Sequence, residues 1–528
     1  MPKVHFPQYR RARHGIELFA GTLLEHARRA GVEIPSDCGG LGKCGHCVVR
    51  IDRGAECLSA KTEPERGQRL APGERLACQA RVVNPVVDMT VFVKELGRYS
   101  IVTETVETDD VPLEPSVKRD GRHVVNASGE VLGRYEGEVY GLALDVGTTT
   151  LAMQIVDLED GRIIATAART NPQISYGNDI ISRIGYTMQH DGGLRELQSV
   201  VIEAVNDELE QMEEQHPELR KSIFNAVVVG NSTMRDLFFG RDVSSLGVIP
   251  FEPIGTDPVE AGAHELGLRI SPQAHVYGGA LIGGHAGADA LADVIACRLH
   301  ESDGVSMVID IGTNGEVVIG NKDKMMSASC AAGGAYEGAT VTCGSGAVEG
   351  AISNVWITDG HVTYETIGGK PPVGVCGSGL IDLLAELLRS GHMSRKAKIG
   401  KDFCLADGIC ITQRDIYELI TAKAGLRLDQ DLLMRYYGVE LAQVQKIFLA
   451  GGFGNFINAE NAVAIGLLPP APERVVRIGN GALAGAREML INQTVRRRSE
   501  QIARSIEHAK PNEREPDFPY LVAEKMYF

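Results

Sequence analysis

The sequence predicts a multidomain α/β protein in which a small cysteine-rich head precedes a larger, internally duplicated unit. Two short stretches indicate the duplication, because residues 142–150 read LALDVGTTT and residues 308–316 read VIDIGTNGE. In each, an apolar run reaches an aspartate and then turns through Gly-Thr, which is typical of a buried strand that ends in a tight turn. Two such turns with similar preceding strands indicate an internal repeat. The third observation is an N-terminal loop that contains Cys38, Cys44 and Cys47.

Length and charge narrow the class of protein. A chain of 528 residues exceeds one hydrophobic core and predicts two to four domains. The formal net charge of −16 argues against nucleic acid and anionic membranes as partners. No apolar run approaches the ~20 residues of a membrane span. The eleven cysteines are odd in number and unevenly placed, which does not fit a disulfide framework and favours a reducing cytoplasm.

Residues 1–95 are expected to form the head. The three cysteines of its glycine-rich loop have the spacing C-x5-C-x2-C, and Cys78 follows in the run RLACQA. Three thiolates from one loop and a fourth from a distant turn are the usual ligands of a [2Fe–2S] cluster. A four-cysteine zinc site is the alternative, but zinc sites usually consist of two separate C-x2-C pairs. The spacing resembles the adrenodoxin-like variant of the ferredoxin (β-grasp) fold, so the predicted metal ligands are Cys38, Cys44, Cys47 and Cys78.

Residues 96–138 are expected to connect the head to the larger unit. The long apolar runs stop here, and residues 104–115 carry many acids and two prolines, as in an extended tether. Residues 123–140 alternate between apolar and polar side chains, which predicts a small hairpin with its turn at 127–129.

Residues 139–528 are expected to form the duplicated unit, because the order strand, strand, helix occurs twice. The first half ends in the apolar strand VVVGNSTM and the second in KIFLAGGFGN. Helices are predicted at residues 199–215, 378–390, 413–425 and 495–509. A glycine turn beyond a strand directs backbone N–H groups and threonine hydroxyls at a phosphate, and the preceding aspartate can hold Mg²⁺ through water.

The two turns and the late apolar strand that ends in Gly-Gly resemble the superfamily of acetate and sugar kinases, heat-shock chaperone ATPases and actin. In that fold two similar halves close on ATP. The resemblance implies a first phosphate loop of Asp145, Gly147, Thr148 and Thr149, a second of Asp310, Gly312, Thr313 and Asn314, and an adenosine site at Gly451, Gly452 and Gly454.

The resemblance extends over nearly the whole chain. A [2Fe–2S] head followed by NPQISYGNDIISRI, VVGNSTM, DIGTNGE, CAAGGAYEGA, VCGSGLID and LAGGFGN is similar to the reductive activators of corrinoid proteins. This implies an ATP-dependent transfer of one electron from the cluster to Co(II) cobalamin, which regenerates Co(I) for methyl transfer. The implied partners are a corrinoid protein and a low-potential donor such as a ferredoxin or a reductase, and the implied assembly is a homodimer. Larger members carry a further small domain where this chain has the 96–138 segment.

Hydrolysis requires a group that orients water against the γ-phosphate. Asp179 is the residue predicted for this role, and its alternative role is a helix N-cap. Asp145 and Asp310 of the turns, which can hold Mg²⁺, are the other predicted catalytic residues.

Three other functions remain open at this stage. One is a small-molecule kinase with a redox-sensing head, and another is an ATP-switched binding module. The third is an activator of radical dehydratases, although those hold a [4Fe–4S] cluster across a dimer and lack a ferredoxin head.

Overall fold

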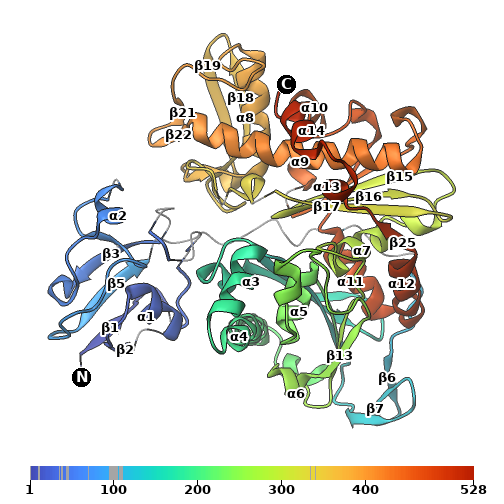
Figure 1. The fold of residues 1–528 in the computed structure, drawn as a ribbon. Helices are drawn as coiled ribbons and strands as arrows, with labels where there is room; N and C mark the ends of the chain where they lie inside the picture. The colour runs from blue at the N-terminus through green and yellow to red at the C-terminus, as the bar shows by residue number, and fades with distance from the viewer. Residues whose placement is uncertain are drawn as a thin grey trace. The chain divides into compact units, whose positions relative to one another are not determined.

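The computed structural model contains two compact units (Figure 1). Unit 1 comprises Met1–Gly97 and Thr170–Ala204, and unit 2 comprises Arg98–Arg169 and Val205–Phe528. The residues that the structure describes are 2–9, 12, 14–34, 36, 40–42, 47–68, 70–93, 105, 111–332, 334–338, 340–452 and 454–528.

The head portion of unit 1 is a five-stranded sheet with one main helix. The sheet has the order β2-β1-β5-β3-β4, and β1 and β5 pair in parallel. Leu23 and Ala27 of the helix α1 are buried in one core with Val4 of β1 and Val91 of β5, as expected for a ferredoxin-like head. The elements are β1 (Lys3–His5), β2 (Ile16–Glu17), α1 (Leu23–Arg29), β3 (Val48–Arg53), η2 (Ala55–Cys57), α2 (Glu63–Arg66), β4 (Glu74–Leu76) and β5 (Met89–Val93).

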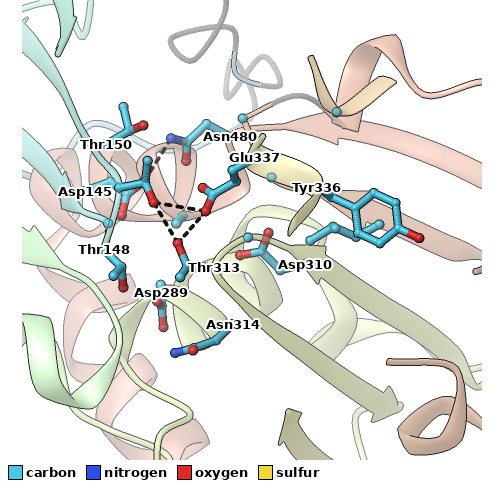
Figure 2. Close-up of a pocket in the computed structure, with 18 of the residues that line it drawn as sticks. Asp145, Thr148, Thr150, Asp289, Asp310, Thr313, Asn314, Tyr336, Glu337 and Asn480 are labelled. Atoms are coloured by element: carbon cyan, nitrogen blue, oxygen red, sulfur yellow. Dashed lines mark hydrogen bonds between the residues drawn. The ribbon is translucent and has the colours of Figure 1, made fainter. Parts of the chain in front are cut away.

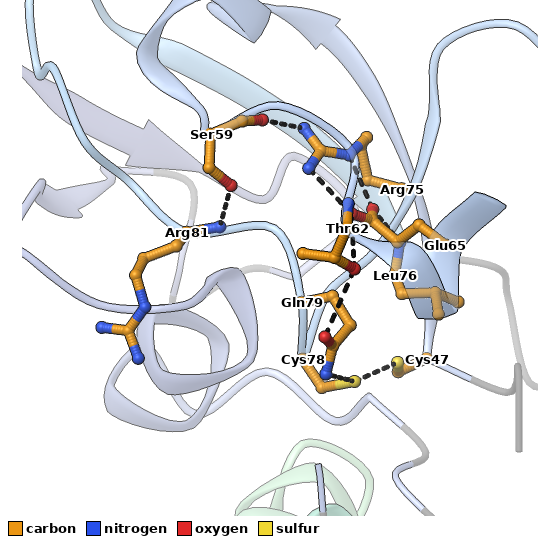
Figure 3. Close-up of polar contacts among 9 residues, drawn as sticks. All are labelled: Cys47, Ser59, Thr62, Glu65, Arg75, Leu76, Cys78, Gln79 and Arg81. Carbon is orange, nitrogen blue, oxygen red and sulfur yellow. Dashed lines mark hydrogen bonds and ion pairs between the residues drawn. The ribbon is translucent and has the colours of Figure 1, made fainter. Parts of the chain in front are cut away.

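A buried ion pair joins α2 to β4 (Figure 3). Arg75 Nε donates to Glu65 Oε1 at 2.7 Å, and its Nη2 donates to Oε2 at 3.0 Å, while the two side chains are 10% and 0% exposed. The backbone N–H groups of Thr62 and Leu76 donate to the same carboxylate. Burial alone raises the pKa of Glu65, but the hydrogen bonds from Arg75 and Thr62 outweigh burial and hold it below its ordinary value. The carboxylate is therefore charged and fully partnered.

Arg75→Met is expected to destabilise the head by about 3–5 kcal/mol at pH 7, because it leaves a buried carboxylate without its partner. The loss should shrink as the pH falls toward about 4, since a proton then neutralises Glu65. The wild-type protein itself becomes less stable as the pH falls. The lowered pKa of Glu65 means that its ionised form stabilises the fold above pH 4.5, and this stabilisation is lost as the pH falls below that value. Urea unfolding of the full chain, followed by the visible absorbance of the cluster, measures both effects.

Arg81→Met is the matched control, because Arg81 lies in the same head with an exposed side chain. Its effect should stay within about 0.5 kcal/mol. Equal losses in the two variants would contradict a specific role for the buried pair.

The second portion of unit 1 contains η3 (Pro172–Ser175), α3 (Ile180–Gln189) and the start of α4 (Gly193–Glu213). Arg28 of α1 donates from Nε to the Ser175 carbonyl at 3.0 Å, and its guanidinium lies 4.5 Å from the ring centre of Tyr176. The N–H of Ile34, which precedes the cysteine loop, donates to Ser175 Oγ at 3.3 Å. The motif NPQISYG thus contacts the backbone that leads into this loop.

Unit 2 is built on two six-stranded sheets, with the orders β11-β10-β9-β12-β14-β13 and β24-β23-β15-β16-β17-β25. The first contains β9 (Tyr140–Val146), β10 (Thr150–Asp157), β11 (Ile163–Thr170), β12 (Ile223–Val229), β13 (Val259–Gly262) and β14 (His275–Gly278). The second contains β15 (Ser306–Ile311), β16 (Asn314–Gly320), β17 (Met325–Ala331), β23 (Ile447–Ala450), β24 (Val475–Gly479) and β25 (Ile506–His508).

The strand pairing confirms the predicted duplication. Strand β9 pairs antiparallel with β10 and parallel with β12, which pairs in parallel with β14. Strand β15 has the same relations to β16, β23 and β24. The third strand of each meander, β11 or β17, lies beside β10 or β16. The turns at Gly147 and Gly312 therefore occupy equivalent places in the two halves.

Two helices pack against these sheets from within the core. Ala292 of α7 and Leu483 of α11 share a core with β9 and β12. Leu291 of α7 shares a second core with Val308 of β15. Contacts with both sheets place α7 between the two halves.

The helices of unit 2 that follow α4 in the chain are α5 (Ser232–Phe238), α6 (Ala263–Leu266), α7 (Ala288–Ala296), α8 (Gly377–Arg389), α9 (Gln413–Tyr437), α10 (Ala459–Ala464), α11 (Gly481–Ile491), α12 (Gln493–Ser505), α13 (Pro511–Arg514) and α14 (Phe518–Lys525).

Helix α4 begins at Gly193, six residues before its predicted start (199 − 193), and two C-terminal helix ends also differ from the sequence-based prediction. Helix α9 continues past residue 425 and ends at Tyr437, where Gly438 follows with a left-handed φ of +85°. Helix α12 ends at Ser505, and the next three residues form β25 beside β17, where a helix to residue 509 was expected. In the second case, strand pairing replaces the last helical turn.

The smaller elements of unit 2 follow β17 in the chain. They are a three-stranded sheet of β18 (Ala351–Thr358), β19 (His361–Thr366) and β20 (Gly374–Val375), and a hairpin of β21 (Phe403–Ala406) and β22 (Ile409–Ile411). Cys404 and Cys410 form a disulfide across this hairpin. Sequence reasoning did not single out this pair. No helix among the described residues is long and apolar enough to cross a membrane.

Residues 111–138, within the segment expected to be a tether, pack into unit 2. They form a three-stranded sheet of β6 (Val117–Asp120), β7 (His123–Asn126) and β8 (Val131–Arg134), which includes the predicted hairpin. Val124 and Leu132 are buried in the same core as α11, and the Glu114 N–H donates to the Ile491 carbonyl at 2.9 Å. Residues 94–104 and 106–110 lie outside the described residues.

Candidate functional sites

A pocket lies in unit 2 where β9 and β15 reach their turns (Figure 2). Residues of both halves line it, so it is formed by the duplication itself. Ten residues predicted from the two turns and the late glycines are among its lining: Asp145, Gly147, Thr148, Thr149, Asp310, Gly312, Thr313, Asn314, Gly451 and Gly452.

The two halves use the same glycine contact to bring the late strand against each turn. Gly230 follows β12 with φ +157°, and a Cβ there would lie 2.6 Å from the carbonyl oxygen of Val146. Gly451 follows β23 with φ +111°, and a Cβ there would lie 2.7 Å from the carbonyl oxygen of Ile311. A side chain at either place would displace the turn, because real Cβ atoms do not approach backbone so closely. Glycine is therefore required by sterics as well as by φ.

The first turn is held by two asparagines that cap helices. Asn231 caps α5 and donates from Nδ2 to Thr148 Oγ1 at 3.0 Å. Asn480 caps α11 and donates from Nδ2 to Asp145 Oδ2 at 2.9 Å. Each amide thus fixes one side chain of the turn and one helix start.

A triangle of side chains joins the two turns. Thr149 Oγ1 and Thr313 Oγ1 lie 2.9 Å apart, and both hydroxyls donate to Glu337 Oε2, with a distance of 3.0 Å from Thr149. Figure 2 shows Glu337 and Thr313 facing each other in the pocket. The hydroxyls that were predicted to contact phosphate therefore contact a carboxylate in this structure.

The pocket is strongly acidic. Besides the two turn aspartates it is lined by Asp289, Glu316 and Glu337, and none of the described lining residues is a lysine, arginine or histidine. Burial raises the pKa of Asp145 to about 6. Burial and the nearby Asp145 raise the pKa of Asp310 to about 7, and burial and Asp310 raise that of Asp289 to about 8. A polyphosphate needs a cation to enter such a site.

Two helix N-termini offset part of this charge. Gly377 is the first residue of α8 and lines the pocket, and Ala482 lies in the first turn of α11. Free N–H groups and the helix dipole at such ends favour an anion. The Nδ2 of Asn314 has no hydrogen-bond partner among the described residues, although it is buried in the pocket wall. It is therefore free to donate to a ligand oxygen.

No group of three or more carboxylate, histidine or cysteine side chains within the described parts of the chain is close enough to hold a metal directly. A cation bound here would therefore keep most of its water, as Mg²⁺ does when it is held by one or two carboxylates and substrate phosphates. Asp145 and Asp310 suit this mode of binding.

The head contains two of the predicted cluster ligands within the described residues (Figure 3). Cys47 precedes β3, Cys78 follows β4, and their Sγ atoms lie 3.3 Å apart without a disulfide. Both are buried, and a hydrogen bond from Cys47 lowers the pKa of Cys78 to about 6. Two adjacent buried sulfurs, of which Cys78 loses its proton readily, fit one iron of a cluster. Cys38 and Cys44 lie outside the described residues.

Gln79 supports this site from beside Cys78. Its Nε2 donates to Cys78 Sγ at 3.5 Å and to the Gly40 carbonyl at 3.0 Å, and its Oε1 accepts from Thr62 at 3.3 Å. Gly42 leaves room for the amide, because a Cβ there would lie 2.9 Å from its Cδ. Hydrogen bonds to a ligating sulfur stabilise a more reduced cluster.

Two predicted residues lie elsewhere. Gly454 begins η10 (Gly454–Phe456) and is not among the pocket lining. Asp179, in unit 1, caps α3: its Oδ1 accepts from the Ser182 N–H at 2.7 Å and its Oδ2 accepts from Ser182 Oγ at 3.1 Å.

Sequence reasoning missed several pocket residues. Glu337 lies in the motif CAAGGAYEGA and Asn231 in VVGNSTM, but neither residue was singled out from the sequence. Asn480 follows Gly479 as Asn231 follows Gly230, so the repeat of Gly-Asn after a strand was a usable signal. Asp289 is one acid among many in the sequence and offered no such signal.

Family models match most of the chain. A [2Fe–2S] iron–sulfur cluster binding domain matches residues 15–83, the middle region of RACo matches 140–302, and the C-terminal ASKHA domain of RACo matches 304–527. A solved structure titled reductive activator for corrinoid, iron-sulfur protein aligns with all of this chain and 98% of its own, with a TM-score of 0.75 and 28% identity. The chain belongs to the reductive activators of corrinoid proteins.

Curated relatives of this activator agree with that assignment. The corrinoid activation enzyme RamQ of Eubacterium limosum is 29% identical over 88% of this chain and 89% of its own. The [Co(II) methylated amine-specific corrinoid protein] reductase of Methanosarcina barkeri is 26% identical over 67% of this chain and 71% of its own. The predicted fold class, a ferredoxin-like head followed by an actin-like and sugar kinase-like ATPase, is confirmed.

Proposed function

We propose that this activator uses ATP to transfer one electron from its [2Fe–2S] cluster to a Co(II) corrinoid, which returns the cobalt to Co(I) for methyl transfer. The main support is the presence of two sites in one chain, a thiol pair suited to iron in the head and an acidic pocket between two Gly-Thr turns in unit 2. In this reaction the reduced cluster loses one electron and the cobalt gains it, so the redox step balances without a further reactant.

The residues of the head hold and tune the cluster in this proposal. The cluster, when bound, supplies a single electron at a low reduction potential, which is about −400 mV for plant-type clusters. Cys38, Cys44, Cys47 and Cys78 are the proposed ligands, and Gln79 stabilises the added negative charge through its bond to the Cys78 sulfur. Burial of Cys47 and Cys78 keeps water away from this edge of the site.

The residues of the pocket bind MgATP in this proposal. Thr148, Thr149, Thr313 and Asn314 donate to the phosphates, and Asp145 and Asp310 hold the hydrated Mg²⁺. Gly451 and Gly452 leave room for adenosine, and Gly454 supports their loop through its N–H bond to Gly451 O at 2.9 Å. Mg²⁺ supplies the positive charge that the lining lacks.

Electron transfer must be coupled to ATP, because Co(II) in a corrinoid protein has a lower reduction potential than such a cluster. For one electron, each 59 mV of this difference lowers the equilibrium constant about tenfold. We propose that the ATPase binds the Co(II) corrinoid protein and changes the axial ligation of the cobalt, which raises its potential. The nucleotide then resets the complex, and this requires the ATP-bound and ADP-bound forms to differ in affinity for the partner.

The remaining assignments belong to the same proposal. The domains are residues 1–95, 96–138 and 139–528, and the chain works as a cytoplasmic homodimer fed by a low-potential ferredoxin or reductase. Its net charge of −16 supports a protein partner over nucleic acid or an anionic membrane.

An anaerobic optical assay tests the proposal. The reduced protein is mixed with a Co(II) corrinoid protein of a methyltransferase system and a low-potential reductant, and Co(I) absorbance is followed with and without MgATP. Growth of Co(I) that depends on ATP is the expected result. Phosphate transfer to a small molecule without Co(I) would instead establish the kinase.

A further inference from the structure

Glu337 lies in a short helical turn at the edge of the nucleotide pocket. It ends the short helix η7 (Ala335–Glu337), which is flanked by Gly334 and Gly338, both with left-handed φ. Tyr336 is 1% exposed and donates its hydroxyl to the Leu419 carbonyl at 3.1 Å. A Cβ at Gly338 would lie 2.5 Å from the backbone of Ser345. The backbone on both sides of Glu337 is therefore packed in place.

The side chain reaches the point where the two phosphate turns meet. Its Oε2 accepts hydrogen bonds from Thr149 of the first turn and Thr313 of the second, and these hydroxyls are 2.9 Å apart. Any phosphate held by both hydroxyls must lie next to this carboxylate. Glu337 belongs to neither turn, so it can remain in place when the turns donate to a ligand.

The other acidic side chains considered for this role accept hydrogen bonds from other partners than the two turn threonines. Asp145 is held by Asn480 within the first turn, and Asp289 accepts from the Ala290 N–H at 2.8 Å. Glu316 accepts from Ser329 at 3.3 Å. Asp179, the residue predicted from sequence, uses both oxygens to cap α3.

We propose that Glu337 orients the water that attacks the terminal phosphate of ATP. When phosphate oxygens accept the hydrogen bonds of Thr149 and Thr313, the Glu337 carboxylate is released from them and accepts one from water instead. The water oxygen forms a bond to phosphorus, the bond from phosphorus to the ADP oxygen breaks with its electron pair, and the proton of water passes to Glu337 and then to solvent. This inference rests on the proposed ATPase function.

The test compares Glu337→Gln, Glu337→Asp and Asp179→Asn in the full chain with a Co(II) corrinoid protein present. Each variant is assayed for MgATP affinity by calorimetry and for kcat by phosphate release. Glu337→Gln should bind MgATP within about threefold of wild type but lose about 10²–10³-fold in kcat, as expected when a positioned acid–base group is removed. Glu337→Asp, which keeps the carboxylate, should recover part of the rate.

Glu349→Gln is the matched control, because Glu349 is an exposed acid nearby in the chain. It should hydrolyse ATP at the wild-type rate, and Asp179→Asn should keep its kcat while its melting temperature falls. Two results would overturn the inference. One is a Glu337→Gln variant with unchanged kcat and tighter ATP binding. The carboxylate would then only bind the two threonine hydroxyls in competition with ATP and would have no part in hydrolysis. The other is loss of kcat in Asp179→Asn alone.

A failure of the activator proposal can be told apart from a failure of the Glu337 proposal. If wild type hydrolyses ATP but never forms Co(I), the activator proposal fails while the role of Glu337 in hydrolysis is still measured. Melting temperatures of all variants separate misfolding from chemistry, and Glu337→Asp keeps the test usable if the amide variant does not fold.

Discussion

Cys47→Ser is expected to abolish Co(I) formation, with a rate at least about 10³-fold below wild type. Cys47 Sγ lies 3.3 Å from Cys78 Sγ in a buried site, and serine oxygen is a poor substitute for a thiolate ligand of iron. Without the cluster, the proposed electron donor is lost. ATP binding in unit 2 should be unchanged, because the described residues that line its pocket all belong to unit 2. Visible absorbance reports the cluster, and calorimetry with MgATP reports the pocket.

Cys57→Ser is the matched control for that loss. Cys57 is also a buried thiol of the head, but its Sγ contacts the Val87 carbonyl at 3.5 Å and it belongs to no predicted ligand set. The control should keep its cluster and its rate. If Cys47→Ser retained ATP-dependent Co(I) formation, the electron would have to travel by another route, and the head could not be the donor.

The parts of the site that depend on local sequence could be predicted. A buried strand followed by Asp-x-Gly-Thr specifies a turn within nine residues, and β9 and β15 end as expected. The equivalence of the two turns also followed from the repeated pattern. The contact of Glu337 with Thr149 could not be predicted, because it joins residues 188 apart and depends on how two halves pack. Its own motif reads only as a glycine-rich turn.

The end of α9 shows the same limit for a helix. Gly425 has the composition of a helix stop, and it was predicted to end the helix. In the structure the helix continues through Gly425, because residues that follow it in the helix, such as Leu426 and Leu428, are buried in the core. Packing thus outweighs the intrinsic cost of glycine, about 1 kcal/mol in a helix interior. The actual stop is Gly438, thirteen residues later (438 − 425).

The acidity of the pocket explains why a cation is expected to be an obligatory part of the substrate. Four of its carboxylates, Asp145, Asp289, Asp310 and Glu316, have pKa values raised first by burial and then by neighbouring carboxylates of the pocket. Adding the charge of a triphosphate to this group without a metal would be strongly unfavourable. The helix N-termini and threonine hydroxyls favour the anion, but the divalent ion must offset the carboxylates.

Asp310→Asn is therefore expected to lower the ATPase rate by about 10²-fold or more, since several kcal/mol of charge stabilisation at the metal are lost. Asp310 is the second-last residue of β15, just before the second turn, and a Cβ at Gly451 would lie 2.9 Å from its Oδ1, so its carboxylate is closely packed. The amide keeps this shape and removes only the charge. The Mg²⁺ concentration that gives half the maximal rate should rise, and ATP-driven Co(I) formation should fall with the ATPase.

Asp429→Asn is the control that separates metal binding from general loss of a buried acid. Asp429 lies in α9 of the same half, is 2% exposed and has a pKa raised by burial to about 7, as Asp310 has, but it does not line the nucleotide pocket. Its replacement should leave the Mg²⁺ dependence unchanged. If both variants lost activity with the same Mg²⁺ response as wild type, Asp310 would be a structural acid. The metal would then have to be held by the phosphates and Asp145 alone.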